Sequence, residues 1–145
     1  MITLYDGDCL KTLKTLPKKS VQCVVTSPPY WGLRDYGTNE QLGLESTPQD
    51  YVEHVRQIFS EIHRVLRNDG VVWLNIGDTY VGTGKGEKRD PKASKHRNTK
   101  HSPVNNKVPG LRGKNLVGIP WRVAFALQDD GWYLRQDIIW EKPNA

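Results

Sequence analysis

Short apolar segments alternate along the chain with longer segments whose apolar residues recur at helical spacing, and this alternation constrains the fold more than any other feature. Parallel strands need a connection of about a dozen residues or more, and a helix is the usual connection. The pattern therefore predicts an α/β fold of mostly parallel strands with crossover helices. The predicted strands cover residues 2–5, 21–26, 71–76 and 133–140, and the predicted helices cover residues 9–16, 47–66 and 120–130.

Capping residues mark the boundaries of these helices. Asp8 is a candidate N-cap for the first helix. Thr47, Pro48 and Asp50 are typical of a helix N-terminus, and residues 68–70 (NDG) are predicted to end the long helix. In open parallel sheets, ligands bind beyond the carboxyl ends of the strands. The polar segments that follow the four predicted strands are thus candidate binding regions: residues 6–8, 26–31, 75–78 and 140–144.

The composition suits one globular domain in a reducing compartment. The chain has 145 residues, of which 37% are hydrophobic and 26% charged. No apolar run approaches the ~20 residues that cross a bilayer, and the N-terminus has no secretory signal pattern. Cys9 and Cys23 form no C-x-x-C pair and have no neighbouring His, so we predict two buried thiols and no metal site. The expected location is the cytoplasm.

Most of the positive charge lies in one segment, residues 82–115, which contains ten Lys or Arg residues but only two carboxylates, Glu87 and Asp90. The segment has no aromatic residue and no apolar periodicity, which predicts a flexible basic insertion. One interpretation is a contact with nucleic-acid phosphates, and the other is a solvated loop without a partner. The candidate phosphate contacts are Lys92, Lys95, Arg97 and Lys100.

The segment Ser27-Pro28-Pro29-Tyr30 carries the most chemical information. Two prolines stiffen the turn and remove two N–H donors, so the turn presents acceptors: the Ser27 hydroxyl and the carbonyls of Ser27 and Pro28. Tyr30 and Trp31 add flat faces on which a planar ring can stack. Such a turn suits a nucleobase that carries an exocyclic amine. The alternative interpretation is a rigid turn whose aromatic residues belong to the core.

Residues 26–31 (TSPPYW) resemble the catalytic signature of DNA amino-methyltransferases, which methylate a nucleobase amine with S-adenosylmethionine. The resemblance covers nearly the whole chain outside the basic insertion and implies part of a Rossmann-like methyltransferase sheet. Carbon-5 cytosine methylation fits poorly, because that chemistry needs a Cys where Tyr30 follows Pro29. The other similar segments, in family order, are residues 5–9, 32–37, 64–66, 69–70, 73–78, 118–122 and 138–144.

The resemblance implies roles for individual residues. Ser27 and Pro28 would accept hydrogen bonds from the amine, Pro29 would stiffen the turn, and Tyr30 would stack on a base flipped out of duplex DNA. Trp31 and Trp140 are further candidates for base contacts. Asp8 matches the family position that reaches the adenine of S-adenosylmethionine, although a helix cap explains it equally well.

Two family features are missing from the sequence: the Gly-rich turn that holds the methionine part of the cofactor and the acidic residue that binds its ribose. In the permuted subclass, which begins with the catalytic motif, this turn comes late in the chain. We therefore expect residues 1–145 to form the N-terminal catalytic part of a longer domain, with the Gly-rich half following residue 145. We also expect these residues alone to bind S-adenosylmethionine weakly or not at all.

Three classes of function remain open on the sequence. The first is a DNA methyltransferase of a bacterial or phage restriction–modification system, acting on cytosine N4 or on adenine N6. The second is a methyltransferase of RNA or of protein amides, which more often has Asn in place of Ser27. The third is a non-catalytic nucleic-acid-binding fragment. The Ser at position 27, preceded by Val25 and Thr26, resembles the cytosine N4 subgroup more closely than the adenine N6 subgroup.

Overall fold

Two parallel strands form the sheet in this computed structural model, which describes residues 1–38, 41–82, 108–141 and 143. Strand β1 (Val21–Thr26) pairs with β2 (Leu66–Leu74), so that Cys23 lies opposite Val71 and Val25 opposite Trp73. A bulge interrupts the ladder between Val21 and Cys23. The parallel pairing and the helix between the strands confirm the α/β prediction for this part of the chain.

Three helices accompany the two strands: α1 (Cys9–Thr15), α2 (Pro48–Val65) and α3 (Ile119–Asp129). The predicted caps of the first two are confirmed. Asp8 accepts a hydrogen bond from the Lys11 N–H at 2.8 Å, and Thr47 accepts one from the Asp50 N–H at 3.1 Å. The predicted end of the long helix at Leu66 is confirmed to within one residue, since α2 ends at Val65 and Leu66 is its C-cap. The predicted break at residues 68–70 was wrong, because these residues lie within β2, which begins at Leu66 and not at residue 71.

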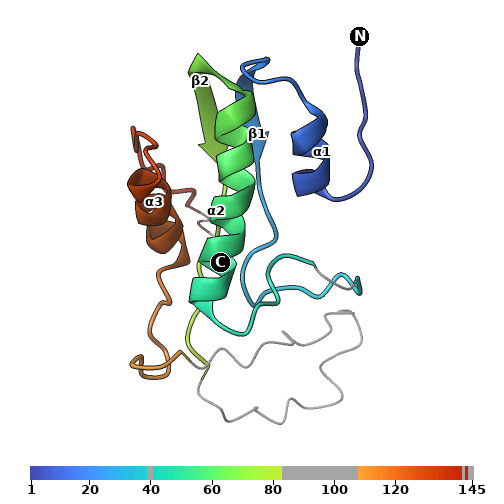
Figure 1. The fold of residues 1–145 in the computed structure, drawn as a ribbon. Coiled ribbons are helices and arrows are strands. Elements are labelled where there is room, and N and C mark those ends of the chain that lie inside the picture. Colours follow the sequence, from blue (N-terminus) through green and yellow to red (C-terminus); the bar gives the residue numbers. More distant parts are fainter. Residues whose placement is uncertain (39–40, 83–107, 142, 144–145) are drawn as a thin grey trace.

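The core lies between α2, α3 and one face of the sheet. Figure 1 shows α2 in front of the two strands and running along them, with α1 on one side of it and α3 on the other. The apolar residues of α2 recur at helical spacing, and Val24, Val72 and Leu74 of the strands pack against the same cluster. Arg56 of α2 donates two hydrogen bonds to Asp130, at 2.9 and 2.6 Å, and holds the pKa of that carboxyl below its ordinary value. The buried residues of the two larger helices are Pro48, Tyr51, Val55, Phe59, Ile62, Val65, Ile119, Val123 and Leu127.

The opposite face of the sheet is open to solvent. Val25, Val71 and Trp73 are 78%, 52% and 54% exposed, and Cys23 is exposed beside them. The expectation that both thiols are buried was therefore wrong, since Cys9 is exposed as well. Cys23 is exposed because it lies on the face of the sheet that no described helix covers.

Two of the four predicted strands do not form within the described residues. Residues 2–5 and 133–140 make no ladder, and large apolar side chains in both segments are exposed. The reason is the absence of a neighbour: β1 and β2 pair with each other, and no other described segment joins either strand. No helix among these residues is long and apolar enough to cross a membrane.

The two ends of the predicted basic insertion are joined. Tyr80 forms an antiparallel bridge with Leu116, and the Val81 and Val117 N–H groups donate to Asn115 and Thr79 carbonyls at 2.8 and 2.9 Å. Val108 is buried in the core. Leu111 packs against the same core, and the Lys114 N–H donates to the Val81 carbonyl at 2.9 Å. The carboxyl-terminal part of the predicted insertion is therefore attached to the domain, although most of its residues are exposed. Lys92, Lys95, Arg97 and Lys100 lie outside the described residues.

Candidate functional site

The Ser-Pro-Pro-Tyr turn begins where β1 ends, beside the end of β2. The Asn75 N–H donates to the Thr26 carbonyl at 2.9 Å and holds the two outgoing segments together. Because both strands run in the same direction, their carboxyl ends meet at one edge of the sheet. The structure thus brings together two of the four predicted binding segments, residues 26–31 and 75–78.

The Tyr30 ring lies between the turn and the end of β2. Its hydroxyl is 3.4 Å from the Ser27 hydroxyl. On the other side, Gly77 approaches the ring so closely that an added Cβ would lie 2.6 Å from Tyr30 Cε2. Ser27 itself is exposed, while Tyr30 is half-buried. The glycine therefore provides the space in which the ring sits.

A substitution at Gly77 tests this arrangement. In Gly77→Ala the new methyl group would collide with the Tyr30 ring, so we expect the ring to move and the domain to lose about 1 kcal/mol of stability. Chemical shifts of ¹³C-labelled Tyr30 should change while the indole N–H signal of Trp31 stays in place. Unchanged Tyr30 shifts would contradict the close packing of Gly77 and Tyr30.

The prolines of the turn are anchored by a residue that sequence reasoning missed. Tyr51, in the first turn of α2, is fully buried and donates its hydroxyl to the Pro29 carbonyl at 2.9 Å. Burial raises the pKa of the Tyr51 phenol well above its ordinary value, so the group stays protonated and remains a donor. Tyr51 precedes Val55 by four residues, so the two lie on the same face of α2. This spacing in the sequence could have indicated that Tyr51 is buried.

The loop after Tyr30 folds back against the turn. Gly43 has a φ of +98°, and an added Cβ there would lie 2.9 Å from the Tyr30 carbonyl oxygen. The Gly43 carbonyl accepts a hydrogen bond from the Gly32 N–H at 2.8 Å. Trp31 is only 1% exposed and donates its indole N–H to the Glu45 carbonyl at 2.9 Å. This burial leaves Trp31 no free face for a base, so its place in the structure is that of a core residue.

The acceptors at the turn differ in their availability. The Pro29 carbonyl is already bonded to Tyr51. No hydrogen bond between described residues ends on the carbonyl of Ser27 or of Pro28. The Ser27 hydroxyl has one long contact, to Tyr30. The acceptors that the sequence singled out, those of Ser27 and Pro28, are thus the ones without a strong partner in the described part of the chain.

Asp78 belongs to the predicted segment 75–78, but its role as a cap for α3 did not follow from the sequence. Its carboxylate accepts hydrogen bonds from the Gly118 and Ile119 N–H groups at 3.0 Å and from the Thr79 N–H at 2.9 Å. Gly118 cannot cap α3 with a side chain, so the distant Asp78 does so instead. Asp78 thus holds the N-terminus of α3, and its neighbour Gly77 packs against the Tyr30 ring. Two adjacent residues therefore position both α3 and the ring.

The remaining predicted site residues form no hydrogen bond with the turn among the described residues, or they lie outside the described ranges. Asp8 is exposed and its Oδ1 caps α1. Trp140 is 79% exposed and sits in a segment that forms no strand. In the part of the chain that is described, no group of three His, Cys, Asp or Glu side chains could hold a metal ion.

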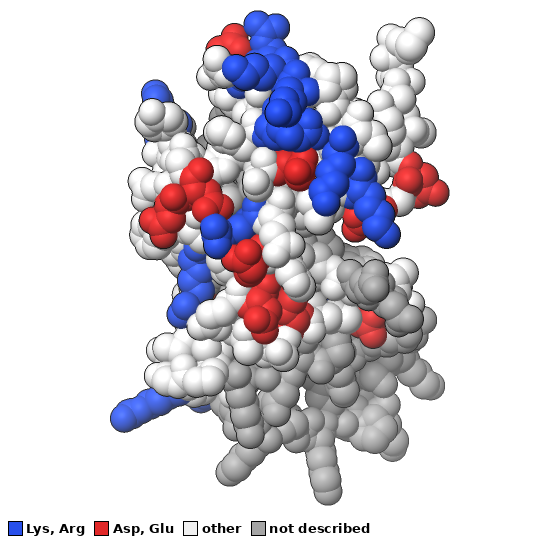
Figure 2. Space-filling view, in the orientation of Figure 1, with Lys and Arg blue, Asp and Glu red and all other residues white. Residues whose placement is uncertain are grey.

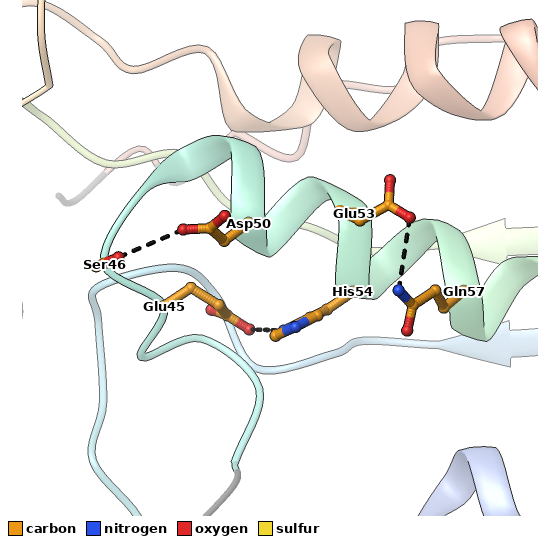
Figure 3. Close-up of a pocket in the computed structure, with 6 residues that line it drawn as sticks. All are labelled: Glu45, Ser46, Asp50, Glu53, His54 and Gln57. Carbon is orange, nitrogen blue, oxygen red and sulfur yellow. Dashed lines mark hydrogen bonds and ion pairs between the residues drawn. The ribbon is translucent and has the colours of Figure 1, made fainter.

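A pocket of about 310 Å³ lies at the amino-terminal half of α2 and is acidic. Figure 3 shows the Glu45 and His54 side chains in direct contact in its lining, with Glu45 Oε1 2.9 Å from His54 Nδ1. Its carboxylates would repel a phosphate group. This pocket is therefore unsuited to the backbone of DNA. The lining residues are Glu45, Ser46, Asp50, Glu53, His54 and Gln57.

The fold and the site define an α/β protein with an acceptor-rich turn and an aromatic ring at the carboxyl edge of parallel strands. The chain belongs to the DNA methylase family, whose pattern it matches over residues 21–145. It is 54% identical over 143 residues to the type II methyltransferase M.XycI of Xanthomonas campestris pv. cyanopsidis, a match that covers 99% of this chain and 47% of the relative.

Two further type II methyltransferases match the chain with similar identity and coverage. One from Citrobacter freundii is 53% identical over 99% of this chain, and M.SmaI of Serratia marcescens is 47% identical over 96% of it. In each case the match covers 47% of the relative. The chain thus spans about half the length of the curated relatives that it matches.

Proposed function

We propose that this chain forms the amine-binding part of a DNA methyltransferase that methylates the exocyclic amine of a flipped base. The observation that carries the proposal is the turn at the end of β1, where Ser27 and Pro28 present acceptors without strong partners beside the Tyr30 ring. Membership of the DNA methylase family and the type II methyltransferase relatives support the same function.

The turn would act on the amine in two ways. Conjugation with the ring makes a base amine a poor nucleophile. Acceptors from Ser27 and Pro28 would hydrogen-bond its two hydrogens, favour a pyramidal nitrogen and direct the lone pair toward the methyl carbon. Tyr30 would stack on the base, and the Tyr51 and Gly77 contacts would hold the turn and the ring in place. The base has to leave the duplex first.

The proposed methyl donor is S-adenosylmethionine, whose sulfonium makes the methyl group electrophilic. The described residues do not form a complete site for it. Asp8 is the one candidate, and one of its oxygens already caps α1. We therefore assign to this chain the steps that concern the amine and the base, and none that concern the donor.

The partner that this function requires is double-stranded DNA. We propose cytosine N4 as the methylated position, because Ser27 stands where adenine N6 enzymes more often have Asp or Asn. Adenine N6 is the alternative. We also propose that Lys92, Lys95, Arg97 and Lys100 contact DNA phosphates rather than bases, because the insertion offers positive charge without aromatic platforms.

A hybrid enzyme tests the proposal. The 143 residues of this chain that match the Xanthomonas relative would replace the matching segment of that protein, to which they are 54% identical. We expect the hybrid to transfer radiolabelled methyl groups from S-adenosylmethionine to duplex DNA. The remaining half of the relative without this chain is the control and should transfer none.

Nucleoside analysis of the methylated DNA identifies the base. N4-methyldeoxycytidine is the expected product in liquid chromatography with mass detection. N6-methyldeoxyadenosine as the sole product would overturn the cytosine assignment and leave the amine chemistry in place. A folded hybrid that binds DNA and cofactor but transfers no methyl group would contradict the proposed function and favour a non-catalytic nucleic-acid-binding role.

A further inference from the structure

A group of positive charges lies on α1, which runs beside β1, and in the turn before β1, at the end of that strand opposite Ser27. It consists of Lys11 and Lys14 on α1 and Lys18 and Lys19 in the turn, and we call these four residues the lysine stripe. All four are exposed. Figure 2 shows Lys and Arg side chains gathered on one side of the molecule, with some acidic side chains beside them.

Hydrogen bonds to α2 fix the backbone that carries the lysine stripe. Arg64 of α2 donates to the carbonyls of Leu13 and Leu16, at 2.7 and 3.1 Å, and so ties the end of α1 to the long helix. The Lys19 N–H donates in turn to the Arg64 carbonyl at 3.2 Å. The four ammonium groups therefore extend from a backbone whose position is set by α2, and do not depend on a loose terminus.

No ion pair between described residues involves any of these four lysines. Glu61 pairs with Arg64 at 2.6 Å, and Asp69 pairs with Arg67 at 3.2 Å. Lys19 also has a φ of 54°, where a glycine would be less strained. The stripe thus carries four ammonium groups without a direct ion-pair partner among the described residues, one of them at a turn position that favours glycine.

The chemistry of the stripe fits a polyphosphate better than a membrane. A membrane-binding helix places large apolar side chains beside its lysines. On α1 the corresponding residues, Leu10 and Leu13, are half-buried, and no large exposed hydrophobic residue lies on the helix. Exposed hydrophobic residues nearby in the chain, among them Met1, Ile2 and Leu4, precede α1 in a segment without secondary structure. A row of lysines on a helix whose own apolar residues are half-buried is typical of a surface that contacts nucleic-acid phosphates.

We propose that the lysine stripe is a second DNA-binding surface, which contacts the phosphate backbone of duplex DNA away from the methylated base. The choice of DNA as the polyanion rests on the proposed function. β1 has six residues and separates Lys18 and Lys19, which precede it, from Ser27, which follows it, by about 20 Å. This half of the stripe therefore contacts DNA beyond the segment that holds the flipped base, and the stripe adds affinity without reading sequence.

Binding of this chain to a random 24-base-pair duplex, measured by fluorescence anisotropy across a salt series, tests the proposal. One variant replaces Lys11, Lys14, Lys18 and Lys19 by Gln. We expect its affinity to fall about tenfold or more, and the slope of log K against log salt to shrink by up to ~0.9 for each lost phosphate contact. The matched control replaces the same four lysines by Arg and should keep both affinity and slope.

Two comparisons separate the stripe from other sources of binding. A variant with Gln at Lys92, Lys95, Arg97 and Lys100 should reduce the slope independently, and its effect should add to that of the stripe variant. Vesicles containing phosphatidylserine test the membrane alternative. Circular dichroism should show that every variant keeps the same helix content.

Three results would overturn the proposal: no binding of the wild-type chain to the duplex, an unchanged salt slope in the stripe variant, or a loss of vesicle binding without a loss of DNA binding. These outcomes are independent of methyl transfer. A hybrid enzyme that fails to methylate would contradict the proposed function, while the salt slope would still decide the role of the stripe.

Discussion

Replacing Ser27 by alanine in the hybrid methyltransferase is expected to lower the rate of methyl transfer about 10²–10³-fold, the usual effect of removing one hydrogen-bonding group that stabilises a transition state. The hydroxyl lies at the end of β1 beside Tyr30, is exposed, and has one contact, at 3.4 Å. Its loss should therefore change the stability of the domain by less than about 0.5 kcal/mol. The measurement is the single-turnover rate with saturating DNA and cofactor.

Ser60→Ala is the matched control for this substitution. Ser60 is an exposed serine on α2, remote from the turn, and its removal should leave the rate unchanged. The dissociation constants of Ser27→Ala for DNA and cofactor should stay near those of the parent, since the hydroxyl is proposed to act on the amine in the transition state. A single-turnover rate within about twofold of the parent would remove Ser27 from the mechanism.

Replacing Trp31 by alanine is expected to destabilise the domain by about 3–5 kcal/mol, a large share of the stability of a typical domain. Trp31 is 1% exposed, and its indole N–H bonds to the Glu45 carbonyl, so alanine would leave both a cavity and an unpaired carbonyl. Trp31→Phe keeps most of the apolar volume and should cost less. Urea unfolding followed by circular dichroism measures all of these changes.

Trp121→Ala and Trp140→Ala are the controls for Trp31→Ala. The two tryptophans are 50% and 79% exposed, and their removal should change stability by less than about 0.5 kcal/mol. If Trp31→Ala costs no more than these controls, Trp31 is not a core residue. A stacking role in base binding would then regain support.

Local signals in the sequence were sufficient for those parts of the fold that depend on neighbours in the chain. Asp8 and Thr47 cap the helices where their side chains predicted caps, and β1 has the predicted bounds. The signals failed where a distant partner decides the outcome. Residues 2–5 and 133–140 have the composition of strands, but a strand requires a paired neighbour, and no described segment provides one.

In the candidate site, too, local features followed from the sequence and contacts with distant residues did not. The acceptors of the turn followed from the prolines themselves, because a residue without an N–H can only accept. The residues that hold the turn in place could not be found in this manner. Tyr51, Gly77 and Asp78 act across 22, more than 40 and 40 residues of chain respectively, and only the packed structure brings them to their partners.

The bare face of the two-stranded sheet has a consequence for the folding of this chain in the cell. The segment between β1 and β2, which includes α2, has to be synthesised before the two strands can pair. During this time β1 is unpaired. Its sequence, VQCVVT, has no charge, proline or glycine and high β-propensity, which are the properties of segments that aggregate through cross-β stacking. Even after pairing, Val25, Val71 and Trp73 remain exposed. The yield of native chain therefore depends on how quickly this face is shielded during synthesis, by a chaperone or by another polypeptide.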